Sequence, residues 1–155
     1  MNGSSQLIIA AVFSFTAALL HIAIIFGGAN WYRLFGAGEG MAKMAESGSF
    51  YPSVVTAIIA CILAVWGLYA LSGAGVILKL PLLKLGLCVI TFIYLLRGIA
   101  GLILPFVTNH PAIAQNSMTF WLVSSSICCV FGIVHLLGLM NSWTQLTGNS
   151  TFTSS

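Results

Sequence analysis

Charged side chains are scarce throughout this sequence. Aspartate, glutamate, lysine and arginine make up 5% of its 155 residues, whereas a soluble domain carries about 25%. Hydrophobic residues make up 59% of the chain. The shortage of charge excludes a soluble globular domain, and the net charge of +3 is too small and too dispersed to indicate a nucleic-acid partner. The composition predicts a protein of the lipid bilayer.

Paired cysteines are missing as well. Cys61, Cys88, Cys128 and Cys129 all fall within apolar runs, and none of them belongs to a C-x-x-C motif. This pattern gives no support for a disulfide framework, a zinc site or a thiol oxidoreductase. We interpret the four side chains as small apolar packing groups, which is the usual role of buried cysteine.

Four long apolar runs occupy most of the chain. A hydrocarbon core about 30 Å thick requires about 20 apolar residues per helix, and four runs reach this length: residues 7–28, 53–78, 85–107 and 119–140. They are continuous, which excludes the alternating segments of about ten residues that build a membrane β-barrel. The sequence predicts an all-α fold, an integral membrane four-helix bundle that forms a single membrane domain over residues 1–155.

Four spans place both termini on one side of the membrane, here named side A, together with the short loop of residues 79–84. The loops of residues 29–52 and 108–118 lie on the opposite side, named side B. The loops of each side carry two lysine or arginine residues, so the positive-inside rule decides little. We favour side A as cytoplasmic because the two lysines of residues 79–84 lie directly beside the membrane.

The loop of residues 29–52 is much longer than the few residues that a helix–helix connection needs. It contains both acidic residues of the chain, Glu39 and Glu46. We expect a short interfacial helix from Met41 to Glu46, preceded by a flexible glycine-rich segment. At the end of the chain, residues 141–155 carry no charge, and we expect them to form a flexible tail.

The segment TFIYLLRGIAGLILP places Arg97 deep in the third run. Arginine does not lose its proton in proteins, and a charge at the bilayer centre costs at least ~2.5–3.5 kcal/mol on insertion scales. Arg97 therefore needs acceptors inside the bundle. At ~1.5 Å per residue, His21 and Arg97 lie roughly 10 and 15 Å from side B, so we expect them to be neighbours. Tyr94 can turn its hydroxyl to the same place, and Glu39 is the acid that we expect to reach Arg97 from the flexible loop.

These residues suggest two functions from different classes. In the first, Arg97, His21, Tyr94 and Glu39 form a polar pocket towards side B that binds a small anionic or lipid-like ligand, because arginine pairs well with carboxylate and phosphate. In the alternative, Arg97 only fixes helix register, and the protein is an accessory or structural subunit of a membrane protein complex. A homo-oligomer or a membrane protein partner is compatible with either hypothesis.

Enzymatic chemistry is less favoured by the sequence. A haem held between His21 and His135 would need both ligands at one level, but the heights of the two residues differ by roughly 13 Å. No convincing pair of nucleophile and base is present for hydrolysis. We expect no catalytic residue, no metal site and no cofactor.

A set of short motifs lies between residues 31 and 98: WYRLFGAGEGMA, GSFYPS, YALSGAG, LPLLKLGL and YLLRG. The set resembles a group of small bacterial membrane proteins of uncharacterised function. That resemblance implies a four-span protein of the bacterial inner membrane, and it implies no activity, cofactor or catalytic residue. It adds interest to Arg33, Glu39, Pro52 and Arg97, which lie within the motifs.

Overall fold

A computed structural model of the protein describes residues 2–108, 110–114 and 116–147. Four long helices and two short ones follow one another along the chain: α1 (Gly3–Leu34), α2 (Glu39–Glu46), α3 (Tyr51–Gly73), α4 (Leu83–Val107), α5 (Pro111–Ala114) and α6 (Met118–Thr147). The helices α1, α3, α4 and α6 are long and apolar enough to cross a membrane. The predicted all-α membrane fold with four spans is confirmed, and no strand occurs in the described ranges.

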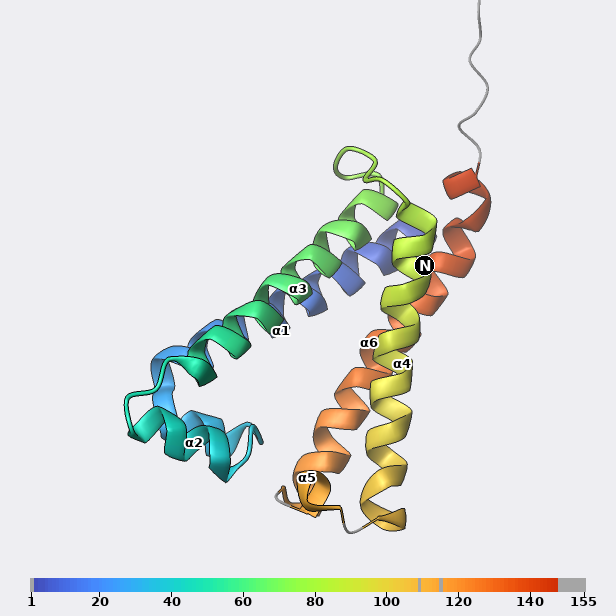
Figure 1. The fold of residues 1–155 in the computed structure, drawn as a ribbon. Coiled ribbons are helices and arrows are strands. Elements are labelled where there is room, and N and C mark those ends of the chain that lie inside the picture. Colours follow the sequence, from blue (N-terminus) through green and yellow to red (C-terminus); the bar gives the residue numbers. More distant parts are fainter. Residues whose placement is uncertain (1, 109, 115, 148–155) are drawn as a thin grey trace, which may run out of the picture.

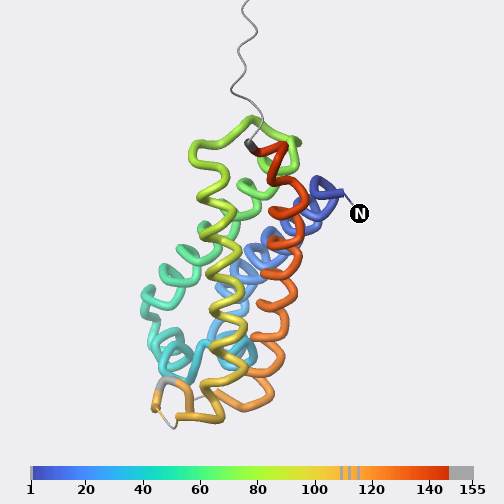
Figure 2. The backbone as a smooth tube through the Cα atoms, turned by 90° about the vertical axis from the view of Figure 1, so that its right-hand side faces the viewer, coloured from blue at the N-terminus to red at the C-terminus, as the bar shows by residue number. Residues whose placement is uncertain are grey.

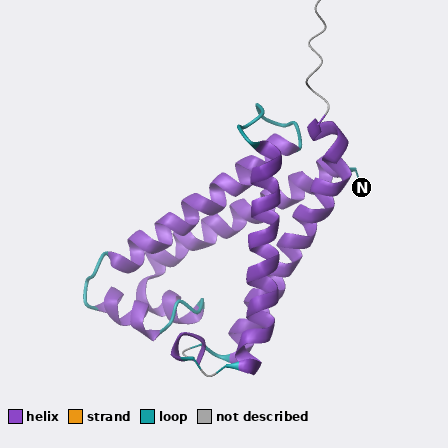
Figure 3. Cartoon of the chain, turned by 45° about the vertical axis from the view of Figure 1, so that its right-hand side comes forward, coloured by secondary structure: helices purple, strands orange, loops and turns teal. Residues whose placement is uncertain are grey.

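The four long helices form two pairs. Helix α1 packs along α3, and α4 packs along α6. The pairs converge at the end where the N-terminus lies and diverge towards α2 and α5 (Figures 1 and 3). The α3–α4 connection and the last described turns of α6 lie at the converging end with the N-terminus (Figure 2). The converging end therefore corresponds to side A, and the diverging end to side B.

Small residues bring the two pairs together at side A. A Cβ atom added to Gly3 of α1 would collide with Ser142 of α6, and one added to Gly138 would collide with Leu7. Leu7 also belongs to a buried cluster with side chains of α4 and α6, namely Leu83, Leu87 and Leu139. Close approach at small residues is the usual way in which helices associate in lipid, where the surrounding medium is as apolar as the side chains.

Two of the helix boundaries predicted at side A differ from those in the structure. Asn141 Nδ2 donates to Gln6 Oε1 at 2.8 Å, and α6 continues to Thr147. Residues 141–147 are thus helical and differ from the expected flexible tail, whereas residues 148–155 lie outside the described residues. Helix α3 ends at Gly73 and not at residue 78, because the chain turns at Gly75, which has φ 76°. The following loop is held by Ser72 Oγ, which donates to Leu78 O and accepts from Leu80 N, both at 2.9 Å.

At side B the chain folds back on itself. Gly28 has φ 63° and ψ −151°, so α1 kinks there before it continues to Leu34, and glycine adopts this backbone conformation without a steric penalty. Helix α2 then packs against α1, with Ala42 fully buried against Ile24 and Tyr32. The short helix expected from Met41 to Glu46 lies within α2.

Candidate functional site

Arg97 projects from α4 towards α6. Its Nη1 donates to Ser125 Oγ at 3.2 Å and its Nη2 donates to Ser124 Oγ at 3.4 Å. The guanidinium also lies over the Trp121 ring, 5.0 Å from the centroid. These partners are neutral and both hydrogen bonds are long, because N–H···O bonds cluster near 2.9–3.0 Å. The local structure orients the guanidinium without neutralising its charge.

The side chain of Arg97 runs along α4 towards side B. Gly101 lies one turn further along α4, and a Cβ there would collide with Arg97 Nη1 and Ser125 Oγ. The absence of a side chain at Gly101 therefore makes room for the guanidinium. Trp121 and Ser125 lie within about two turns of the start of α6. The charge is thus nearer to the membrane surface than the backbone of Arg97, as expected for a long cationic side chain.

The expected ion pair between Glu39 and Arg97 is wrong. Arg33 Nε and Nη2 donate to the two carboxylate oxygens of Glu39 at 2.8 and 3.0 Å, and Arg33 Nη1 donates to Glu46 Oε1 at 2.7 Å. The reason is that α2 folds back against the end of α1, which places both acids beside Arg33. Hydrogen bonds from Arg33 hold the pKa of the Glu39 carboxyl and that of the Glu46 carboxyl below their usual range. Both acidic side chains of the chain are therefore engaged outside the spans.

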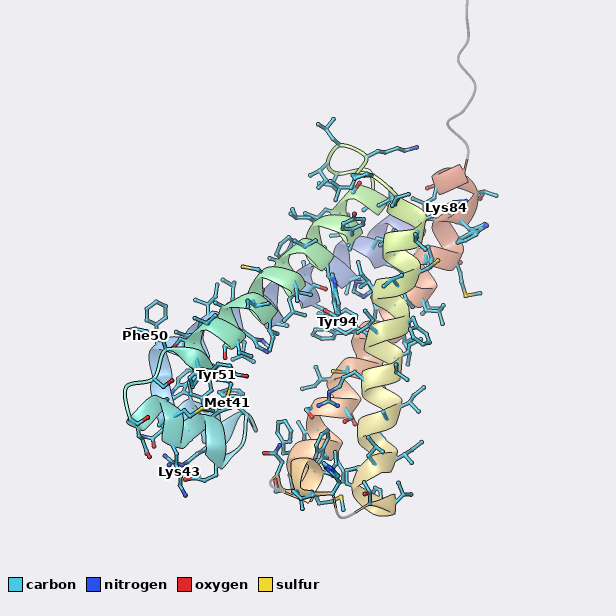
Figure 4. The ribbon with its side chains drawn as sticks, in the orientation of Figure 1. Met41, Lys43, Phe50, Tyr51, Lys84 and Tyr94 are labelled. Atoms are coloured by element: carbon cyan, nitrogen blue, oxygen red, sulfur yellow. The ribbon has the colours of Figure 1, made fainter. Side chains whose placement is uncertain are left out.

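Tyr94 also lies elsewhere than predicted. Its hydroxyl is 3.1 Å from Ser14 Oγ, and its ring packs against Trp66, Phe131 and His135 at centroid distances of 4.8, 5.5 and 5.1 Å. Figure 4 places this residue between the two helix pairs, above the level at which they diverge. Tyr94 therefore packs the crossing of the helix pairs, and it does not line the pocket described next.

A pocket of about 380 Å³ lies between α1, α2, α3 and α4 at the diverging end. Its polar lining comes from His21, Tyr32, Thr56 and Arg97, and much of the remaining surface is apolar. The volume is within the range of about 300–1,000 Å³ that is usual for ligand sites. The structure thus brings His21 and Arg97 to one pocket, whereas Glu39 and Tyr94 are not among the lining residues.

His21 lines this pocket, and the hydrogen bond made by its Nδ1 fixes the role of that ring nitrogen. Its Nδ1–H donates to Ala17 O at 2.8 Å, because a carbonyl oxygen can only accept. In the neutral imidazole Nε2 is then the acceptor, and in the imidazolium it becomes a second donor. His21 can therefore receive a proton-bearing group of a ligand or, when protonated, can bind an anion.

Tyr32 is a pocket residue that sequence reasoning missed. It is 1% exposed, and its hydroxyl has no hydrogen-bond partner among the residues that the structure describes. A buried unpaired polar group costs about 1–3 kcal/mol, so an acceptor within the pocket would be favourable. The kink at Gly28 separates Tyr32 from His21 and Ile24, so helical spacing in the sequence gives no signal for it. Thr56, buried on α3, has no signal in the sequence either.

The pocket combines hydrogen-bond donors with apolar walls. The guanidinium of Arg97 and the hydroxyls of Tyr32 and Thr56 can all donate, and no carboxylate lies among the lining residues. Charge-assisted hydrogen bonds from arginine to an anion are about twice as strong as neutral ones. Such a site suits a carboxylate or a phosphate attached to an apolar group.

Comparison of the chain with protein-family models, with curated proteins and with solved structures finds no match. The class of protein therefore follows from the fold. Four apolar helices of sufficient length, arranged in two pairs, define a multi-pass helical membrane protein.

Proposed function

We propose that the protein binds a small anionic or lipid-like ligand in the pocket lined by Arg97, His21, Tyr32 and Thr56. One observation carries the proposal: the charge of Arg97 has neutral hydroxyl partners, whereas both acids of the chain bind Arg33. A charged group removed from water is costly unless it is paired. An anion in the pocket would supply the missing pair.

The surroundings of Arg97 favour binding because they fix the guanidinium in advance. Ser124, Ser125 and Trp121 hold it beside the pocket, and Gly101 leaves the space that it occupies. Ordering a flexible side chain on binding costs about 0.5–1.5 kcal/mol. This cost is already met in the free protein, so more of the interaction energy contributes to affinity.

We also propose a membrane and an orientation for the protein. We place the protein in a bacterial inner membrane with both termini in the cytoplasm. The resemblance of the motifs between residues 31 and 98 supports the choice of membrane. Lys79 in the α3–α4 connection and Lys84 at the start of α4 support the orientation. Lys84 Nζ lies 4.3 Å from the centroid of the Trp143 ring, as expected for side chains at an interface. The pocket then lies in the outer half of this membrane.

The test compares octanoate with octanol, which has the same chain length and no charge. Purified protein in a zwitterionic detergent is unfolded thermally in the presence of each compound. A ligand at 100 times its Kd stabilises the folded state by about 2.7 kcal/mol. We expect octanoate to raise the Tm of the native protein well above the value in octanol.

Three variants test whether this effect depends on the pocket. Arg97→Gln should abolish the difference between octanoate and octanol, whereas Lys43→Gln, which removes an exposed cation on the same side, should retain it. Tyr32→Phe provides a second pocket variant that keeps the fold and should reduce the difference. Equal stabilisation of Arg97→Gln and Lys43→Gln by octanoate would contradict the proposal. Lower stability of Arg97→Gln with no response to anions in any variant would favour the accessory-subunit hypothesis.

A further inference from the structure

The side-B end of the pocket is covered by protein. Phe35, Gly36 and Ala37, which follow α1, line the pocket together with Met41 of α2. A Cβ atom on Gly36 would collide with the ring of Phe120, so the α1–α2 loop touches the beginning of α6. The cover therefore reaches from one helix pair to the other. A solute arriving from the water on side B meets this cover before it meets Arg97.

The flank of the pocket is less enclosed. At the side-A half, the ring of Tyr69 in α3 occupies the space next to Gly86 of α4, and its Oη donates to Pro81 O in the α3–α4 connection at 3.1 Å. Towards side B the two pairs diverge (Figures 1 and 3). Ile59 of α3 lines the pocket and is also 39% exposed. The pocket is therefore open to the outside at this residue of an apolar span.

The level of the charge fits a lipid headgroup. The guanidinium contacts Trp121 and the serines at positions 124 and 125, within about two turns of the side-B end of α6. Exposed aromatic residues, which favour the membrane–water interface, lie at the same end: Trp31, Phe50 and Tyr51. An anionic headgroup needs only a short displacement from the interface to reach Arg97.

We propose that the anion is the headgroup of a bilayer lipid of the side-B leaflet. The lipid enters between α3 and α4, places a phosphate on Arg97 and Tyr32, and leaves its acyl chains in the bilayer beside Ile59. The volume of about 380 Å³ suits a headgroup whose chains remain outside. Basic pockets between membrane helices are a known mode of headgroup recognition. This inference rests on the proposed function and specifies the source of its ligand.

The test uses three probes with related chemistry. Phosphatidylglycerol and phosphatidylcholine with identical acyl chains are added to the full-length protein in detergent, and bound lipid is counted by native mass spectrometry. Glycerol phosphate, which carries the headgroup chemistry without chains, is titrated in parallel. We expect one phosphatidylglycerol to be retained at least tenfold more tightly than phosphatidylcholine and than glycerol phosphate.

Variants test both the contact and the route. Arg97→Gln should lower the affinity for phosphatidylglycerol at least tenfold, with Lys43→Gln as the charge control. Ile59→Trp should obstruct this opening of the pocket and lower lipid binding severalfold. Its matched control is Ile58→Trp, because Ile58 is 55% exposed and does not line the pocket. Both isoleucines are exposed, so these two variants keep the test valid if Arg97→Gln fails to fold.

The outcomes separate this inference from the proposed function. Binding of glycerol phosphate that depends on Arg97 and equals that of phosphatidylglycerol would overturn the lipid source and leave the anion site intact. Absence of any binding that depends on Arg97 would overturn both. Lipid binding that is lost in Lys79→Gln or Lys84→Gln and retained in Arg97→Gln would place the lipid at side A and contradict the inference.

Discussion

The two arginines of the chain occupy opposite environments. Arg33, exposed in the last turn of α1 at side B, binds two carboxylates at 2.7–3.0 Å. Arg97, within a span, has two serine hydroxyls at 3.2 and 3.4 Å and an indole ring. Water could stabilise the charge of Arg33 without help, whereas the charge of Arg97 requires a counter-charge. The acids are placed where they fix α2 against α1, and the deeper charge remains available for a ligand.

The largest effect on ligand affinity should come from a carboxylate placed next to Arg97. Ser124→Asp would place an acid beside Nη2, and we expect the internal ion pair to lower octanoate affinity more than tenfold. Ser124→Asn has nearly the same size without charge and should change the affinity little. Titration of both variants measures the effect. Unchanged affinity in Ser124→Asp would mean that the pocket does not use the charge of Arg97.

The next effect concerns the space that Arg97 occupies. Gly101→Ala would force the guanidinium and Ser125 apart, and overpacking of this kind costs about 1–3 kcal/mol. Gly40→Ala is the matched control, since nothing lies within 4 Å of a Cβ there. We expect a lower free energy of unfolding for Gly101→Ala alone, measured in mixed micelles. Equal stability of the two variants would show that the side chain of Arg97 does not run along α4.

Replacement of Tyr32 should have two smaller effects, one on the stability of the free protein and one on its affinity for an anion. Tyr32→Phe removes a hydroxyl that lacks a partner within the described ranges, so the free protein should be as stable as the native one or slightly more stable. The same variant should lose about 0.5–1.5 kcal/mol of anion affinity, the usual contribution of one hydrogen bond. Tyr51→Phe, at an exposed position, serves as the control. A loss of stability without a change in affinity would contradict the role of Tyr32.

The smallest expected effect concerns Arg33 and pH. The pKa values of the Glu39 and Glu46 carboxyls are lowered in the folded state, so their stabilisation is present above the unfolded value of about 4.3. It is lost as the pH falls through the lowered folded values. We expect the hydrogen-exchange protection factors of the α2 amides, which correct for the intrinsic exchange rate at each pH, to fall over that acidic range. In Arg33→Gln, α2 should exchange faster at neutral pH and lose most of this dependence.

Run lengths predicted the spans because the bilayer imposes a length on each helix. Counting residues from side B also predicted that His21 and Arg97 would be close, and both line one pocket. Depth along a helix follows from a constant rise per residue. It is therefore available from the sequence once the spans are known.

The direction of a side chain and the path of a loop are not available in this way. Glu39 was expected at Arg97, but its partner depends on how α2 packs against Ile24 and Tyr32 after the kink at Gly28. Tyr94 shares a helical face with Arg97, yet its hydroxyl lies near Ser14 of another helix. These outcomes depend on tertiary packing between distant segments, and spacing within one helix does not encode it.

A structure of the protein determined in a bilayer that contains phosphatidylglycerol would show whether a lipid headgroup binds Arg97. We expect a headgroup oxygen within about 2.7–3.2 Å of the Arg97 guanidinium, with the acyl chains leaving the pocket beside Ile59. A guanidinium that meets acyl chains without an acceptor, or that binds a carboxylate of the protein itself, would contradict lipid binding at this site.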